Sequence, residues 1–198
     1  LVVVTTQSKK INPADVLQLR GYFSSTQAGE VRWSVDDSSI NLASTALTPV
    51  VVQYGQRADS FAEVSANLAL RTSSLFARST FTFTLTYTTD RLVTSQSSVV
   101  ITTNGAPLNG QLIVTPESGE MLSTVFFMSS TQWIDEDIPL TYQYAYASSA
   151  SNPYSVFRSK SELSYCESVL PGGAAGQNFG VTIRAQVFDS LGASASAK

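Results

Sequence analysis

The residues best suited to chemistry are three consecutive acidic side chains, Asp135, Glu136 and Asp137. Carboxylates that share a turn are typical calcium ligands, but calcium takes six to eight oxygens, so other loops would have to contribute. Further acidic candidates are Glu117, Glu120 and Asp189. The same carboxylates can instead accept hydrogen bonds from backbone N–H groups of their own turn. The sequence favours this structural role, and calcium remains the alternative. We therefore expect no metal site and no cofactor.

Catalysis has little support in the rest of the chain. The absence of histidine removes the commonest general base and excludes Ser-His-Asp and Cys-His catalysis within this sequence. Cys166 has no basic neighbour, so we expect an inert buried thiol, with a bond to another chain as the alternative. A hydrolase that uses Asp135 and Asp137 is disfavoured, because adjacent carboxylates on a turn rarely face a shared cleft. We expect a protein that is not an enzyme.

Composition excludes two classes of partner. Charged residues are 14% of the chain and the net charge is −3. No cluster of Lys and Arg could neutralise successive phosphates, so nucleic acid is not expected. No apolar run reaches the roughly 18 residues that cross a bilayer, so this segment is not expected to insert into a membrane. The sequence contains no Asn-x-Ser/Thr sequon, but it is rich in Ser and Thr, which could carry O-linked glycans.

Alternating hydrophobicity predicts an all-β fold. In residues 80–88, Phe81, Phe83 and Leu85 alternate with threonines, which is the period of a strand and excludes a helix. Trp33 lies on the apolar face of another predicted strand and is placed like the core tryptophan of an Ig-like strand C. The final hairpin is predicted at residues 179–192, with Val181, Ile183, Ala185 and Val187 directed inward. Less regular segments are read as a short strand at 40–42, a strand at 67–70 within 61–70, and a polar loop at 148–152.

Residues 104–110 divide the chain, because they place two Asn-Gly pairs and a proline between two apolar runs. We expect two domains, residues 1–104 and 105–198, each of the usual sandwich length of about 100 residues. The region from 104 to 146 has the order Asn-x-x-Pro-x-x-Gly, then Val-x-Pro-x-x-Gly, then Trp-x-Asp-x-Asp-x-Pro-Leu-x-Tyr. This order resembles the REJ (receptor for egg jelly) module of polycystin-1-like receptors and related protist and algal surface proteins.

The resemblance implies two tandem Ig/fibronectin-III-like β-sandwich domains. It also implies an extracellular, non-catalytic structural or interaction module of a large cell-surface or ciliary-surface protein, within a filament such as a flagellar hair. Its partners would then be other domains of its own chain or assembly. The alternative is a ligand-binding or adhesion ectodomain of a polycystin-like receptor. The family usually has tyrosine where this sequence has Phe81 and Phe179, so its tyrosine corner is expected to be absent from both domains.

Overall fold

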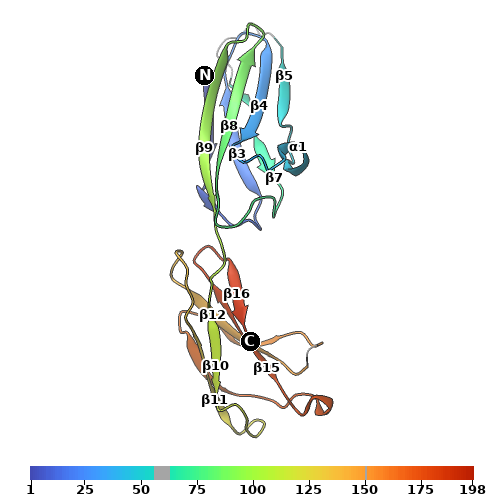
Figure 1. Ribbon diagram of the computed structural model, residues 1–198, viewed down its shortest axis with the longest axis vertical. Coiled ribbons are helices and arrows are strands. Elements are labelled where there is room, and N and C mark those ends of the chain that lie inside the picture. The colour runs from blue at the N-terminus through green and yellow to red at the C-terminus, as the bar shows by residue number, and fades with distance from the viewer. Residues whose placement is uncertain (56–62, 150) are drawn as a thin grey trace. The chain divides into compact units, whose positions relative to one another are not determined.

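The computed structural model describes residues 1–55, 63–149 and 151–198, and its regular secondary structure consists almost entirely of strands (Figure 1). The chain divides into two compact units, Leu1–Gly105 (unit 1) and Ala106–Lys198 (unit 2). Each unit has two mainly antiparallel sheets, and the alternation of buried and exposed residues along the strands directs one face of each sheet inward. The all-β, fibronectin-like and Ig-like prediction is confirmed.

Unit 1 is a sandwich of two sheets. One sheet has the order β2-β9-β8-β4-β5, and in the other β3 pairs with β1, β6 and β7. The strands of the first sheet are β2 (Lys10–Ile11), β4 (Gly29–Val35), β5 (Val51–Tyr54), β8 (Thr80–Thr89) and β9 (Thr94–Thr103). Those of the second are β1 (Val2–Thr6), β3 (Leu17–Phe23), β6 (Val64–Ser65) and β7 (Leu68–Leu70).

The predicted alternation of unit 1 produces a closed core. Phe81, Phe83 and Leu85 are at most 1% exposed, and the intervening threonines face outward along β8. Trp33 is 3% exposed, and its indole N–H donates to the Ala66 carbonyl at 2.8 Å. The core positions predicted for β8 and the placement of Trp33 are therefore confirmed.

The strand expected at residues 40–42 is wrong. The structure has a single helical turn, α1 (Leu42–Thr45), capped by the Asn41 side chain, which accepts from the Ala43 N–H at 3.0 Å. An asparagine at the N-cap satisfies a free N–H group of the first turn, and this local bond outweighs weak strand propensity. The strand expected at 67–70 is present as β7, whereas residues 61 and 62 of the ambiguous segment lie outside the described residues.

Unit 2 has one sheet of order β10-β11-β14 and a second of order β13-β12-β15-β16. The first contains β10 (Gln111–Thr115), β11 (Val125–Thr131) and β14 (Tyr165–Val169). The second contains β12 (Thr141–Ala147), β13 (Ser155–Ser161), β15 (Thr182–Phe188) and β16 (Ser194–Ala197), and a 3-10 turn, η1 (Ala175–Gln177), precedes β15. Residue 150 of the predicted 148–152 loop lies outside the described part of the chain. No helix in the described ranges is long and apolar enough to cross a membrane.

The core of unit 2 is smaller than expected. Of the four residues expected to face inward, Ala185 and Val187 are fully buried, but Val181 and Ile183 are only half-buried, so they are not the core residues that the sequence predicted. Phe179 is 63% exposed at a positive φ of 58°, outside β15, so it does not occupy the strand position that the sequence suggested. The centre of this core is Tyr144, which has no exposed surface and whose hydroxyl donates to the Ser164 carbonyl at 2.5 Å.

Candidate functional site

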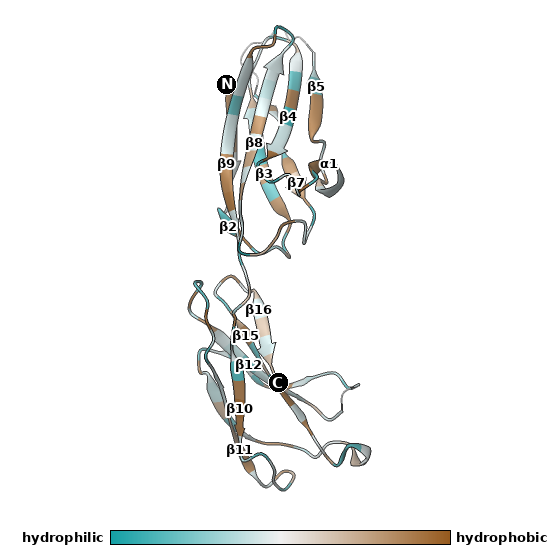
Figure 2. Cartoon of the chain, viewed as in Figure 1, coloured by the Kyte–Doolittle hydropathy of each residue, from teal (hydrophilic) through white to brown (hydrophobic). Residues whose placement is uncertain are grey.

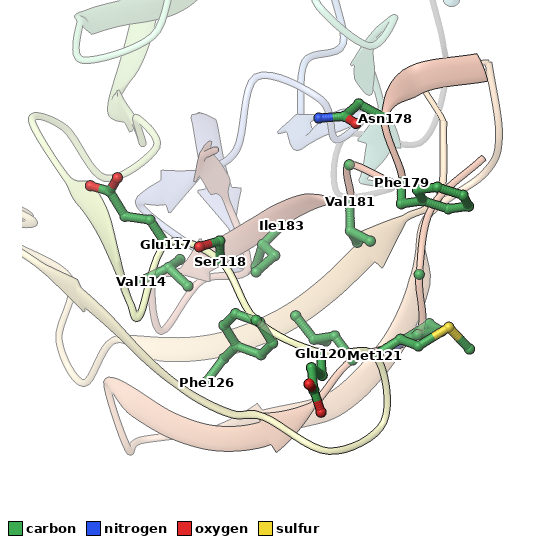
Figure 3. Close-up of a pocket in the computed structure, with 15 residues that line it drawn as sticks. Val114, Glu117, Ser118, Glu120, Met121, Phe126, Asn178, Phe179, Val181 and Ile183 are labelled. Carbon is green, nitrogen blue, oxygen red and sulfur yellow. The ribbon is translucent and has the colours of Figure 1, made fainter. Parts of the chain in front are cut away.

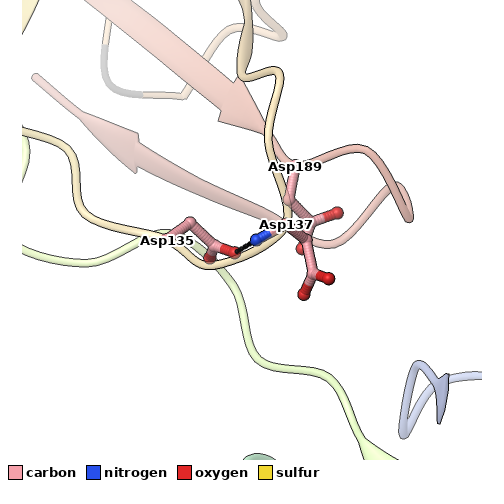
Figure 4. Close-up of side chains that lie close together, drawn as sticks. All are labelled: Asp135, Asp137 and Asp189. Atoms are coloured by element: carbon pink, nitrogen blue, oxygen red, sulfur yellow. Dashed lines mark hydrogen bonds between the residues drawn. The ribbon is translucent and has the colours of Figure 1, made fainter.

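The pairing of β12 with β15 assembles an acidic cluster. Thr141 at the start of β12 lies opposite Phe188 at the end of β15, so the loop before β12 meets the turn after β15. This pairing brings Asp135 and Asp137 together with Asp189, and carboxylate oxygens of the three residues lie within 4.8 Å of one another (Figure 4). Asp189 was one of several acidic residues that could have joined the turn. It does so because it directly follows Phe188, which pairs with Thr141 at the start of β12.

Backbone N–H groups engage two of these carboxylates. Oδ1 of Asp135 accepts from the Asp137 N–H at 2.8 Å (Figure 4). Oδ1 of Asp189 accepts from the N–H groups of Leu191 and Ala193 at 2.9 and 2.8 Å. Asp189 is only 4% exposed, so these bonds satisfy a polar group that lies away from water. Each of the two carboxylates thus fixes the backbone of its own turn, which is the Asx arrangement expected for short acidic side chains.

The other acidic candidates lie elsewhere. The Glu136 side chain is exposed and does not belong to the three-carboxylate group. Glu117 and Glu120 line a cavity beside the first residues of β15, whereas the acidic cluster follows its last residue. At about 3.3 Å per residue, the length of β15 separates the two places by roughly 20 Å. The structure therefore brings together Asp135, Asp137 and Asp189, and not the three consecutive acidic residues of the sequence.

Cys166 is buried in β14, at 8% exposure. Burial raises the pKa of its thiol to about 11, and the positive charge of Arg158 opposes this shift only in part. A thiol with so high a pKa is a poor nucleophile at neutral pH. The location of Cys166 thus agrees with the inert thiol expected from the sequence.

A cavity of about 550 Å³ lies in unit 2 between its two sheets (Figure 3). Half-buried apolar side chains of both sheets line it, among them Val114, Phe126 and Ile183. Its lining also includes the exposed residues Met121 and Phe179. The volume lies within the range of about 300 to 1,000 Å³ that is usual for ligand pockets.

The outward face of the β10-β11-β14 sheet is apolar. Phe127 and Tyr165 are 40% and 50% exposed, and their rings stack with centroids 6.0 Å apart. Val125 and Val169 lie opposite each other on the same face, and Ile113 extends the patch to β10. All five are large hydrophobic residues at least 40% exposed. We call Ile113, Val125, Phe127, Tyr165 and Val169 the apolar face of unit 2.

The REJ domain model matches the whole chain, residues 1–198. The chain belongs to the REJ family. This membership confirms the resemblance of the residue 104–146 motifs to the REJ module. The REJ chain has no match among curated proteins.

Several solved structures are similar to this REJ chain at low identity. The fibronectin(III)-like modules of Clostridium thermocellum CbhA share 10% identity over 100% of this chain and 92% of that one, with a TM-score of 0.39. Murine CEACAM1b shares 11% identity over 100% of this chain and 96% of its own, with a TM-score of 0.39. A Ca²⁺-stabilised, ice-binding adhesin of an Antarctic bacterium shares 13% identity over 98% of this chain and 46% of its own, with a TM-score of 0.49.

Sequence reasoning missed the apolar face of this REJ chain, although the signal was present. The residues Leu112 to Val114, and again Val125 to Met128, are consecutive apolar residues. Successive side chains of a strand point to opposite faces, so such a run makes both faces apolar. The hydrophobic colouring of β10 in Figure 2 shows the result.

Proposed function

We propose that this REJ chain is a non-catalytic, extracellular interaction module that contacts other domains of its own chain or assembly. The apolar face of unit 2 is the observation that carries the proposal. Monomeric proteins rarely leave a large contiguous apolar patch in water, and such patches mark protein contacts. Family membership supports the extracellular placement.

The chemistry of the apolar face favours a broad protein contact over a small ligand. The five residues lie on one pleated surface of three neighbouring strands. Glu167 is the charged residue among them, opposite Phe127 across the sheet. A flat patch with stacked aromatic rings at its centre resembles the core of an interface, which is depleted in charge and enriched in aromatic residues.

The proposal extends to the setting of the module. Its two compact units, which divide between Gly105 and Ala106, would act as separate domains, one residue from the boundary expected between residues 104 and 105. The parent would be a large cell-surface or ciliary-surface protein, and the contacts could repeat along a filament such as a flagellar hair. O-linked glycans on the abundant Ser and Thr residues fit such a surface.

Photo-cross-linking tests the proposal. A photoreactive amino acid replaces Phe127 in the protein within its native assembly, and the matched control replaces Gln96, an exposed residue of β9. We expect cross-links from position 127 to other domains of the assembly, and several-fold fewer from position 96. Equal cross-linking from both positions, or none from position 127, would contradict the proposal.

A further inference from the structure

Two corresponding sheets of the two units carry one charged residue each, and the charges have opposite sign. In both units, the first strand pairs with a central strand that also pairs with later strands of the same sheet. In unit 1, the strands β1, β3, β6 and β7 contain Arg20 and no other charged residue. In unit 2, the strands β10, β11 and β14 contain Glu167 and no other. Both side chains are exposed, and no ion pair or hydrogen bond engages either within residues 1–55, 63–149 and 151–198.

The outward face of the β1-β3 pair in unit 1 combines its cation with apolar side chains. Val3 lies directly opposite Tyr22, and Thr5 lies opposite Arg20. Val3 is 36% exposed and Tyr22 is half-buried, so an aliphatic and an aromatic side chain adjoin the guanidinium. Glu63 lies before β6 and beyond Tyr22, at the opposite end of the face from Arg20. We call Val3, Thr5, Arg20 and Tyr22 the arginine face of unit 1.

Glu167 limits what can cover the apolar face of unit 2. It lies opposite Phe127 in the sheet, and the Phe127 ring stacks on that of Tyr165. A carboxylate that loses its water in a contact costs free energy unless a cation or hydrogen-bond donors replace that water. A second apolar face would bring a second Glu167 into the same contact, and like charges oppose association. We therefore expect the occupant to supply a cation among apolar groups, as the arginine face does.

We propose that the apolar face of unit 2 binds the arginine face of unit 1 in a second copy of this chain, with Glu167 paired to Arg20. This inference rests on the proposed function, because it names the occupant of the apolar face. The two faces belong to different units, so the contact between copies is heterologous, and each added copy leaves one face of each kind free. A standard interface has roughly 20 to 30 residues a side, more than these faces provide, so we expect a weak dissociation constant of about 0.1 to 1 mM.

Charge reversal tests the pairing. Sedimentation equilibrium of the natural chain from about 10 µM to about 1 mM should show a mass that rises with concentration. Glu167→Arg and Arg20→Glu should each weaken the association about ten-fold or more, because each brings two like charges together. An equimolar mixture of the two variants should associate like the natural chain, since each variant then meets an opposite charge on the other. Arg91→Glu, at an exposed residue in the turn after β8, is the matched control and should leave the association unchanged.

The same series separates this contact from its alternatives. If Glu167→Arg weakens the association and Arg20→Glu does not, the occupant is another surface and the proposal is overturned. It is equally overturned if the natural chain stays monomeric at about 1 mM, if the mixed variants do not associate, or if Arg91→Glu acts as strongly as Arg20→Glu. Cross-linking from position 127 in the native assembly is a separate measurement, so the proposed function can stand where this pairing fails.

Discussion

Removal of the Phe83 ring is expected to cost unit 1 a large fraction of its stability. Phe83 has no exposed surface and lies in β8 between Val35 of β4 and Val99 of β9. Its ring is 6.5 Å from that of Phe81, so Phe83→Ala loses both buried area and an aromatic neighbour. A change of this kind costs about 3 to 5 kcal/mol. The free energy of unfolding of a domain is about 5 to 15 kcal/mol, so this loss is a large fraction of the total.

Urea titration followed by Trp33 fluorescence measures this loss, because Trp33 packs in the same core. Phe83→Leu, which keeps most of the side chain, should cost about 1 kcal/mol and still fold. Thr84→Ala is the matched control on the outward face, where the Thr84 and Ser98 hydroxyls are 2.9 Å apart, and it should change stability by about 0.5 kcal/mol or less. If Phe83→Ala were as mild as Thr84→Ala, the assignment of the inward face would be refuted.

Three predictions concern unit 2. Tyr144→Phe should lower the free energy of unfolding by about 1 to 2 kcal/mol in urea titration, because the hydroxyl bonded to the Ser164 carbonyl is buried; an unchanged value would contradict that bond. In the folded protein, burial raises the pKa of the Cys166 thiol from 9.0 to about 11, so the thiol should react slowly with iodoacetamide at pH 8. The free energy of unfolding should fall only as the pH rises above about 9, because the thiol of the unfolded chain ionises there before that of the folded protein. Fast alkylation of the folded protein would show an exposed thiolate. Millimolar calcium should leave the thermal midpoint of unit 2 unchanged, because Oδ1 of Asp135 and Oδ1 of Asp189 already accept hydrogen bonds from backbone N–H groups. A strong rise of the midpoint with calcium that is lost in Asp137→Ala would instead show a calcium site.

The sequence predicted the parts of the fold that depend on local periodicity. The alternation around Phe83 specifies a strand because no other regular structure repeats every two residues. The helical turn after Asn41 was missed because one side-chain hydrogen bond decides it against weak periodicity. The exposure of Phe179 was missed because its left-handed backbone conformation, with a φ of 58°, lies in the turn before β15, and a period of two does not reveal such a turn.

For the candidate sites too, the sequence predicted local features and missed those that depend on strand pairing. The acidic turn was visible as a run of carboxylates, but the inclusion of Asp189 depends on the pairing of β12 with β15. The apolar face was encoded in consecutive apolar residues, yet its continuity across three strands depends on register, such as the diagonal stacking of Phe127 on Tyr165. Register is a property of strand pairs, so it could not be read from either strand alone.

Hydroxyl-radical footprinting of the intact native assembly, compared with the isolated chain, tests most directly whether the apolar face is a contact surface. Phe127 and Tyr165 are exposed in the isolated chain and oxidise readily, as does Phe76 in unit 1, which is 60% exposed and is the internal control. We predict that oxidation of Phe127 and Tyr165 falls several-fold in the assembly while that of Phe76 changes little. Equal oxidation of Phe127 and Tyr165 in the two samples would contradict an interaction module that docks through this face.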